Sequence, residues 1–382
     1  ETNSPEISAD DPKNKPTDPN LASNGKPFPP LDPETLPESR TITALSLFPA
    51  TLNLNSPHAY RQLLVTAQFD NGDSADVTRQ VTWTQSSPLL AISSRGLARP
   101  LTGGALDLTA TLGGQSATTK VTVSGLETST APDWVRDVTP VIAAAGCGAG
   151  TCHGSKDGKD GFNLSLRGYD PIFDVRAFTD DHGSRRTNLA SPDDSLMLLK
   201  ATGAVPHEGG QRMTVGSKDY QTIRDWISQG AKLDLTVKKV QSIAITPENP
   251  VVQNIGGRQQ FSVIATYPDG STRDVTGEAF LEVGNTEVAD TDKFALVSAL
   301  RRGEAPILAR YEGAYASTTM TVMGDRSGFA WQSPPVFNEI DTFTAAKWER
   351  MKTLPSELAT DSEFLRRDHL DLTGLPPTPE VV

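Results

Sequence analysis

Residues 62–78 read QLLVTAQFDNGDSADVT, and residues 260–276 read QFSVIATYPDGSTRDVT. Each stretch alternates apolar and polar residues, turns at Asn-Gly or Asp-Gly, and closes on Asp-Val-Thr. Alternation with a period of two, followed by such a turn, is typical of a β-hairpin that buries one face. The matching positions all lie 198 residues apart. This spacing is too long for a solenoid repeat and indicates two copies of one domain.

Short strand patterns with turn signals extend around both stretches, and they predict all-β sandwiches over residues 41–125 and 240–324. Both copies resemble bacterial immunoglobulin-like domains of group 2. The resemblance rests on the opening Ile243, Ile245 and Pro247, on the apolar strand, on the Asp-Gly turn and on Asp-Val-Thr. It implies a structural spacer, or a module that contacts a cell-surface protein or polysaccharide.

Both cysteines of the chain lie between the copies, in the stretch CGAGTCH at residues 147–153. Two thiols followed by histidine is the arrangement that anchors a c-type haem, although the usual spacer has two residues and this one has four. Gly146, Gly148 and Gly150 are expected to let the longer loop bulge. Two alternatives stay open on these residues alone: a short disulfide loop, or part of a zinc site completed by scattered ligands.

Further stretches in the same region make a resemblance specific. Residues 161–171 read GFNLSLRGYDP, residues 192–200 read PDDSLMLLK, and residues 205–210 read VPHEGG. Together with the cysteine loop, SRR at 184–186 and DWISQGA at 225–231, they resemble the planctomycete-type cytochrome c domain. That resemblance implies one covalent haem c per chain. Cys147 and Cys152 would be its thioether anchors and His153 its proximal ligand.

The distal ligand is expected to be His207, because the resemblance is carried by the Pro-His-x-Gly-Gly stretch. His58 and His369 fall in other domains. The alternatives are an open sixth position or one of three other residues, namely Met213, His182 and Met197.

Other side chains are assigned with less specificity. The expected walls of the haem pocket are Phe162, Leu164 and Leu166. Four arginines are candidates for pairing with propionates, although a solvated surface is the favoured interpretation of each: Arg167, Arg185, Arg186 and Arg212. A loose acidic set fits no calcium-loop spacing and is interpreted as surface: Asp157, Asp160, Asp170 and Asp174. No motif places a catalytic nucleophile beside a base.

Two helices are predicted in residues 126–239, one leading into Cys147 and one from Ser217 to Gly230. Residues 1–40 are polar and Pro-rich, which predicts a disordered tether. Residues 325–382 are interpreted as a linker and the truncated start of a helical domain. Ile340 and the stretch FLRRDHLDLTGLPPTP at 364–379 resemble the domain of unknown function that follows these cytochromes.

The expected fold class is therefore multidomain: two all-β immunoglobulin-like sandwiches flanking a mostly α cytochrome c-like domain, with a short helical C-terminal fragment. A net charge of −12 makes nucleic acid an unsuitable partner, and no apolar run is long enough for a transmembrane span. The chain begins without Met, as a mature N-terminus would.

The expected function is an exported, periplasmic or cell-surface monohaem cytochrome that passes single electrons to a redox protein partner. It would be an electron-transfer protein rather than an enzyme. The alternatives are a haem-based sensor or peroxidatic enzyme, and an adhesion scaffold in which haem is structural.

Overall fold

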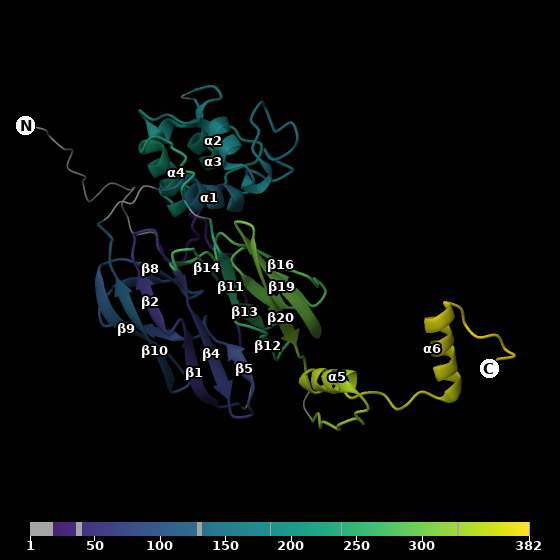
Figure 1. Cartoon of the computed structure of the whole chain (residues 1–382). Helices are drawn as coiled ribbons and strands as arrows, with labels where there is room; N and C mark the ends of the chain where they lie inside the picture. Colours follow the sequence, from purple (N-terminus) through teal and green to yellow (C-terminus); the bar gives the residue numbers. More distant parts are fainter. Residues whose placement is uncertain are drawn as a thin grey trace, which may run out of the picture. The chain divides into compact units, whose positions relative to one another are not determined.

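The computed structural model describes residues 18–35, 40–127, 132–183, 185–237, 239–326 and 328–381. It separates into two compact units, Glu1–Gly324 and Asp325–Val382. The first unit holds both repeats and the region between them, and the second holds two helices (Figure 1).

The first repeat is an antiparallel β structure. Its sheets have the orders β1-β4-β5, β2-β10-β9-β6 and β3-β8-β7, in which only β2 and β10 pair in parallel. Alternate residues of its long strands are buried, as the period of two requires. The strands are β1 Ile42–Phe48, β2 Thr51–Leu54, β3 Arg61–Gln62, β4 Leu64–Phe69, β5 Ser74–Asp76, β6 Thr82–Thr84, β7 Leu90–Ile92, β8 Leu97–Pro100, β9 Gly104–Leu112 and β10 Gln115–Val123.

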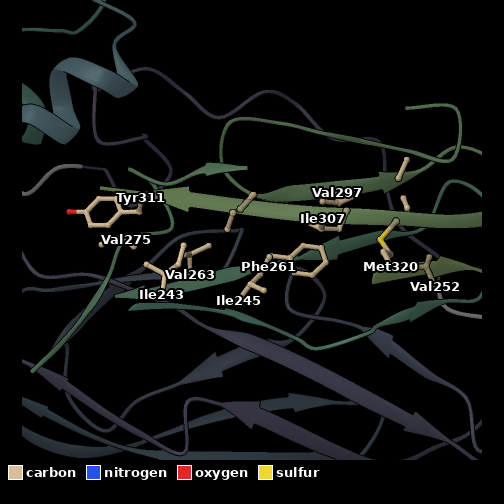
Figure 2. Packing of buried hydrophobic residues seen from close by; sticks show 14 of the residues in the cluster. Ile243, Ile245, Val252, Phe261, Val263, Val275, Val297, Ile307, Tyr311 and Met320 are labelled. Carbon is tan, nitrogen blue, oxygen red and sulfur yellow. The ribbon is translucent and has the colours of Figure 1, made fainter. Parts of the chain in front are cut away.

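The second repeat has the same strand order, β11-β14-β15, β12-β20-β19-β16 and β13-β18-β17. Its core gathers between the strands around Phe261 and Ile307 (Figure 2). Both repeats are therefore immunoglobulin-like β structures. The strands are β11 Ser242–Thr246, β12 Val251–Val252, β13 Arg258–Gln260, β14 Ser262–Thr266, β15 Thr272–Asp274, β16 Phe280–Val283, β17 Ala289–Thr291, β18 Leu296–Ala299, β19 Gly303–Tyr311 and β20 Ala314–Val322.

The two repeats bind each other through equivalent residues. The backbone N–H of Gln62 donates to Asp274 at 2.7 Å, and the backbone N–H of Gln260 donates to Asp76 at 2.7 Å. Both carboxylates belong to the Asp-Val-Thr signature, and all four residues are buried. The contact is thus reciprocal, like the isologous contact of a symmetric dimer, but it lies within one chain.

The expected mostly α domain between the repeats is not present, so the predicted fold class was wrong. The described chain is mainly β, with six sheets. Helices between the repeats are short because the Gly-rich and polar stretches separating them have no apolar periodicity. They are a π-helical turn at Trp134–Val138, α1 Thr139–Ala144, α2 Pro171–Thr179, α3 Leu196–Thr202, α4 Lys218–Ser228, and single 3-10 turns at Leu166–Gly168 and Pro192–Asp194.

These short elements share one apolar core. Trp134 and Trp226 lie at its centre, with ring centroids 4.6 Å apart, and Phe178 packs on Trp134. Helix α4 begins after Ser217, as predicted, because the Ser217 hydroxyl accepts the Tyr220 N–H and caps the helix.

Residues 18–35 differ from the expected tether. They pack on both repeats: the N–H of Ser94 donates to Asn20 at 2.9 Å, and Phe28 meets Phe294 edge-on at 4.8 Å. Composition was misleading here because this segment packs through polar side chains, main-chain groups and one aromatic ring rather than through an apolar stripe. Residues 1–17 and 36–39 of the predicted tether lie outside the described residues.

The second unit contains α5 Glu339–Arg350 and α6 Asp361–Thr373. Capping boxes begin both helices, with Asn338 before α5 and Thr360 before α6. Across the residues that the structure describes, no helix has the length and apolar character needed to cross a membrane.

Candidate functional site

A cavity of about 480 Å³ opens in the region between the repeats, and we call it the central cavity. Its walls come from the cysteine loop, from α1 and α3, and from the loop that precedes α4. Its residues include Cys147, Cys152, His153, His207, Phe162, Phe178, Met197, Met213, His182, Arg185, Arg186, Arg212, Lys159 and Lys200.

The cysteine loop is wound back on the end of α1 by main-chain hydrogen bonds. The N–H of Cys147 donates to Ile142, and the N–H of His153 donates to the Cys147 carbonyl at 3.0 Å. This compact turn brings both thiols and the imidazole to one wall of the central cavity. The two cysteines are free, so the disulfide alternative has no support here. Burial raises the pKa of the Cys147 thiol to about 11.

Glycine serves this loop in two ways that the sequence did not separate. Gly146 has a φ of +77° and ends α1 in the left-handed region. Gly148 has ordinary dihedrals, but a Cβ there would lie 3.1 Å from the Ser165 carbonyl. Gly148 is therefore required for close backbone approach rather than for positive φ, and Gly150 shows neither need.

His153 is oriented by two contacts with Phe162. Its Nδ1 lies 3.1 Å from the Phe162 carbonyl, and the two rings pack with centroids 4.6 Å apart. A carbonyl only accepts, so Nδ1 carries the proton and Nε2 keeps a free lone pair. Burial lowers the pKa of His153, which favours the neutral form that metals bind.

His207 faces His153 from the other side of the central cavity. The ring centroids are 6.4 Å apart, and the ring planes are within 3° of parallel. The Nδ1 of His207 lies 2.9 Å from the Gly210 carbonyl, which again leaves Nε2 free. Gly209 makes room for the ring, since a Cβ there would lie 2.8 Å from its Cε1. Lys200 holds the preceding turn by donating to the Pro206 carbonyl at 2.6 Å.

The alternative distal residues are also gathered here. His182, Met197 and Met213 all line the central cavity, and Met213 is almost fully buried. His58 belongs to the first repeat and His369 to α6. Among the described residues, no three His, Cys, Asp or Glu side chains converge as a free metal ion would need.

Three of the four candidate arginines line the central cavity, and the fourth lies elsewhere. Arg185 and Arg212 line the central cavity. Arg186 lines it too but is buried, donates to the carbonyls of Ala177 and Gly161, and stacks on Phe162 at 4.6 Å. Arg167 instead lies over Phe280 of the second repeat.

The expected pocket wall and acidic set are only partly at the site. Phe162 lines the central cavity, Leu164 is buried in the core, and Leu166 is 54 % exposed. Asp160 lines the central cavity and Asp170 caps α2. Asp174 accepts two hydrogen bonds from Ser165, and Asp157 lies in the exposed loop after the cysteines.

Sequence reasoning gave no role to Lys200 or Phe178 and missed the contacts that Arg186 and Phe162 make beside His153. Arg186, Phe162 and His153 form a continuous stack, and Lys200 fixes the turn before His207. Phe178 adds a further cavity wall against Phe162. None of these contacts has a local signal, because each joins residues distant in the chain or uses a main-chain carbonyl.

Comparison with known proteins finds a family model that matches one part of the chain. Residues 339–382 match the family model PSCyt2, a protein of unknown function (DUF1549). This match covers the C-terminal helices and supports the resemblance noted for that segment.

A wider similarity links the chain to Ice-binding protein 1 of Shewanella frigidimarina (strain NCIMB 400). The two are 27 % identical over 272 residues, which covers 70 % of this chain and 27 % of that protein. The chain therefore spans about a quarter of the length of this curated relative.

Solved structures with some likeness include domains of the S-layer protein SbsC. Domains 5–6 give a TM-score of 0.29 at 8 % identity, covering 75 % of this chain and 99 % of that one. Domains 1–6 give 0.21 at 10 % identity, covering 75 % and 29 %. Likenesses this weak carry no argument about function.

Proposed function

We propose that the central cavity holds one covalently attached c-type haem and that the protein passes single electrons through it. Cys147 and Cys152 are the attachment points, His153 is the proximal ligand and His207 is the distal ligand. The finer resemblance of this region to planctomycete-type cytochromes c is part of the proposal.

The facing pair of imidazoles is the observation that carries the proposal. His153 and His207 would hold the iron, because both line the central cavity, their ring centroids lie 6.4 Å apart, and each Nδ1 is bound to a main-chain carbonyl. A porphyrin supplies its own four nitrogens, so two protein ligands complete an iron site. Both thiols lie on the same cavity wall as His153, which suits covalent attachment beside the proximal ligand.

The haem group, when bound, supplies reversible one-electron chemistry with a potential set by its axial ligands and burial. The chain's own residues orient and enclose it. The carbonyls of Phe162 and Gly210 hold the proton of each imidazole on Nδ1, so each Nε2 keeps a lone pair that could bind a metal. Arg185 and Arg212 offer guanidinium groups to carboxylates.

The chemistry of attachment also bears on location and partners. Covalent attachment to two thiols suits an exported protein, in the periplasm or at the cell surface, where a redox protein would be the electron partner. The paired immunoglobulin-like repeats then serve as a rigid spacer, or as the contact to a cell-surface protein or polysaccharide.

The test is an absorbance spectrum of the purified full chain, oxidised and reduced, with its mass after denaturation. We expect one retained haem mass and a six-coordinate low-spin spectrum that CO does not change. Cys152→Ser should lose the haem or keep a single thioether. A featureless visible spectrum with the bare polypeptide mass rejects the proposal. A high-spin site that binds CO supports a sensor or peroxidatic enzyme instead.

A further inference from the structure

The loop that carries His207 is held by α3 and by a second, distant part of the chain. It runs from Gly203 to Ser217, between α3 and α4, and contains no helix or strand. The Ala201 carbonyl accepts the N–H groups of Arg212 and Met213, and this attaches the loop to the end of α3. The Leu199 carbonyl also accepts the Val205 N–H, and Lys200 donates to the Pro206 carbonyl, so α3 holds the turn before His207 as well. Residues 211–219 bond in addition to another part of the chain.

That part is a tight turn at residues 21–27, which we call the strap. It closes on itself through the bridge between Leu21 and Pro27 and the hydrogen bond from the Ala22 N–H to Lys26. The Lys26 N–H also donates to the Asn24 side chain at 3.0 Å. These local bonds give the strap a defined shape, which a tether would lack.

The strap binds the loop through main-chain groups. The N–H of Thr214 donates to the Asn24 carbonyl at 2.9 Å, and the N–H of Asp219 donates to the Ser23 carbonyl at 3.0 Å. Lys26 reaches the Gln211 carbonyl at 2.5 Å. These three bonds fall on residues 211–219, which begin four residues after His207.

The strap and the residues that directly follow it, 28–32, are together fixed to both repeats. Arg99 of the first repeat donates to the Leu21 carbonyl at 3.0 Å. Arg95 donates to the Pro29 carbonyl at 3.0 Å. Arg258 of the second repeat donates to the Asp32 carbonyl at 2.8 Å. The strap therefore connects the paired repeats to the loop that carries the proposed distal ligand.

We propose that the strap positions His207, so that the arrangement of the two repeats controls axial ligation in the central cavity. This inference rests on the proposed haem site. Ser23, Asn24, Gly25 and Lys26 are positioning residues, since none lines the central cavity and each acts through the loop.

Gly25 gives the sharpest test. It has a φ of +75°, and a Cβ there would lie 1.9 Å from the Thr214 hydroxyl oxygen and 2.9 Å from the Ser217 Cβ. Gly25→Ala should therefore push the strap off the loop. Gly72→Ala is the matched control, because Gly72 has a φ of +83° but nothing within 4 Å of its Cβ position. Both variants place an alanine at a positive φ, but only the Gly25→Ala side chain would collide with a neighbouring residue.

Two measurements on the full chain separate the outcomes. Amide exchange at Thr214 and Asp219 should be roughly tenfold faster in Gly25→Ala and unchanged in Gly72→Ala. The haem-loaded, reduced Gly25→Ala protein should also gain a CO-binding high-spin fraction. If both variants exchange alike and neither binds CO, the strap does not position the loop. If the parent protein carries no haem, the haem proposal fails, and the exchange rates still decide whether the strap holds the loop.

A second pair of variants tests the same inference if the Gly25→Ala protein does not fold. Lys26→Met removes the bond to Gln211, and Lys120→Met changes an exposed lysine on β10. We expect several-fold faster exchange at Thr214 in Lys26→Met alone. Equal exchange in these two variants also overturns the inference.

Discussion

The imidazole rings of His153 and His207 lie within 3° of parallel across the central cavity, with their centroids 6.4 Å apart. Each ring has its Nδ1 bound to a main-chain carbonyl. The two side chains are therefore fixed in orientation before any group lies between them, which is the preorganisation that a tight axial pair requires.

The first prediction concerns the distal position. His207→Ala should keep covalent haem but lose the low-spin spectrum, and its reduced form should bind CO, because the sixth position opens. His182→Ala is the control, since His182 also lines the central cavity. Low-spin, CO-insensitive iron in His207→Ala would assign the distal ligand elsewhere, with Met213 the first alternative.

The second prediction concerns the stack behind His153. Arg186→Met should destabilise the protein by about 2–4 kcal/mol, because the carbonyls of Ala177 and Gly161 lose their buried donor. Arg176→Met should cost less than about 0.5 kcal/mol, since Arg176 makes an exposed ion pair with Asp180. Denaturant midpoints measured at one pH provide the comparison. Equal midpoints in the two variants would contradict a structural role for Arg186.

The third prediction concerns the reciprocal contact of the repeats. Asp76→Ala and Asp274→Ala should each lower the free energy of unfolding by about 2–4 kcal/mol, because each strands a buried N–H in the other repeat. Asp76→Ala should lower the free energy of unfolding more than Asp274→Ala, because Asp76 also pairs with the buried Arg79. The position in the second repeat that corresponds to Arg79 is occupied by Gly277, which has no charge to pair with Asp274.

Asp107→Ala, an exposed change on β9, is the control for both aspartate variants. Thermal melts followed by circular dichroism would measure all three. Aspartate variants that melt with the control would show that the two repeats do not depend on each other.

The fourth prediction concerns pH. Asp219 is buried beside Lys218 and Glu278, and it accepts the Ser23 hydroxyl at 3.2 Å. Burial raises the pKa of Asp219 to about 6, although Lys218 and Arg99 oppose the shift and Glu278 adds to it. The folded state therefore holds this proton more tightly than the unfolded state. The resulting stability is fully present below about pH 4 and is lost as the pH rises through about 6.

The expected loss at Asp219 is at most about 3 kcal/mol. Asp219→Asn cannot titrate, so its free energy of unfolding should change less between pH 4 and pH 6.5 than that of the parent. Urea titrations across this range would measure the difference. Parallel pH profiles for the two proteins would show that Asp219 does not titrate in this window.

Local patterns were sufficient for the elements whose signal lies in neighbouring residues. The period-two alternation around Asp76 and Asp274 predicted both β repeats, and Ser217 predicted the start of α4. The same reasoning gave a mostly α middle region, which was wrong. The error was to extend two short helical patterns across the intervening loops, whose apolar residues show no helical periodicity.

The sequence by itself determined the two β copies, because periodicity is a property of adjacent residues. It also predicted one site of Cys147, Cys152, His153 and His207, through the cysteine motif and a family resemblance. Only the tertiary structure decided that His207 lies beside His153, that Arg186 stacks on Phe162, and that residues 21–32 bind both repeats and the loop after His207. These contacts join distant segments largely through main-chain carbonyls and N–H groups. Every residue type carries such groups, so composition and spacing hold no record of where they pair.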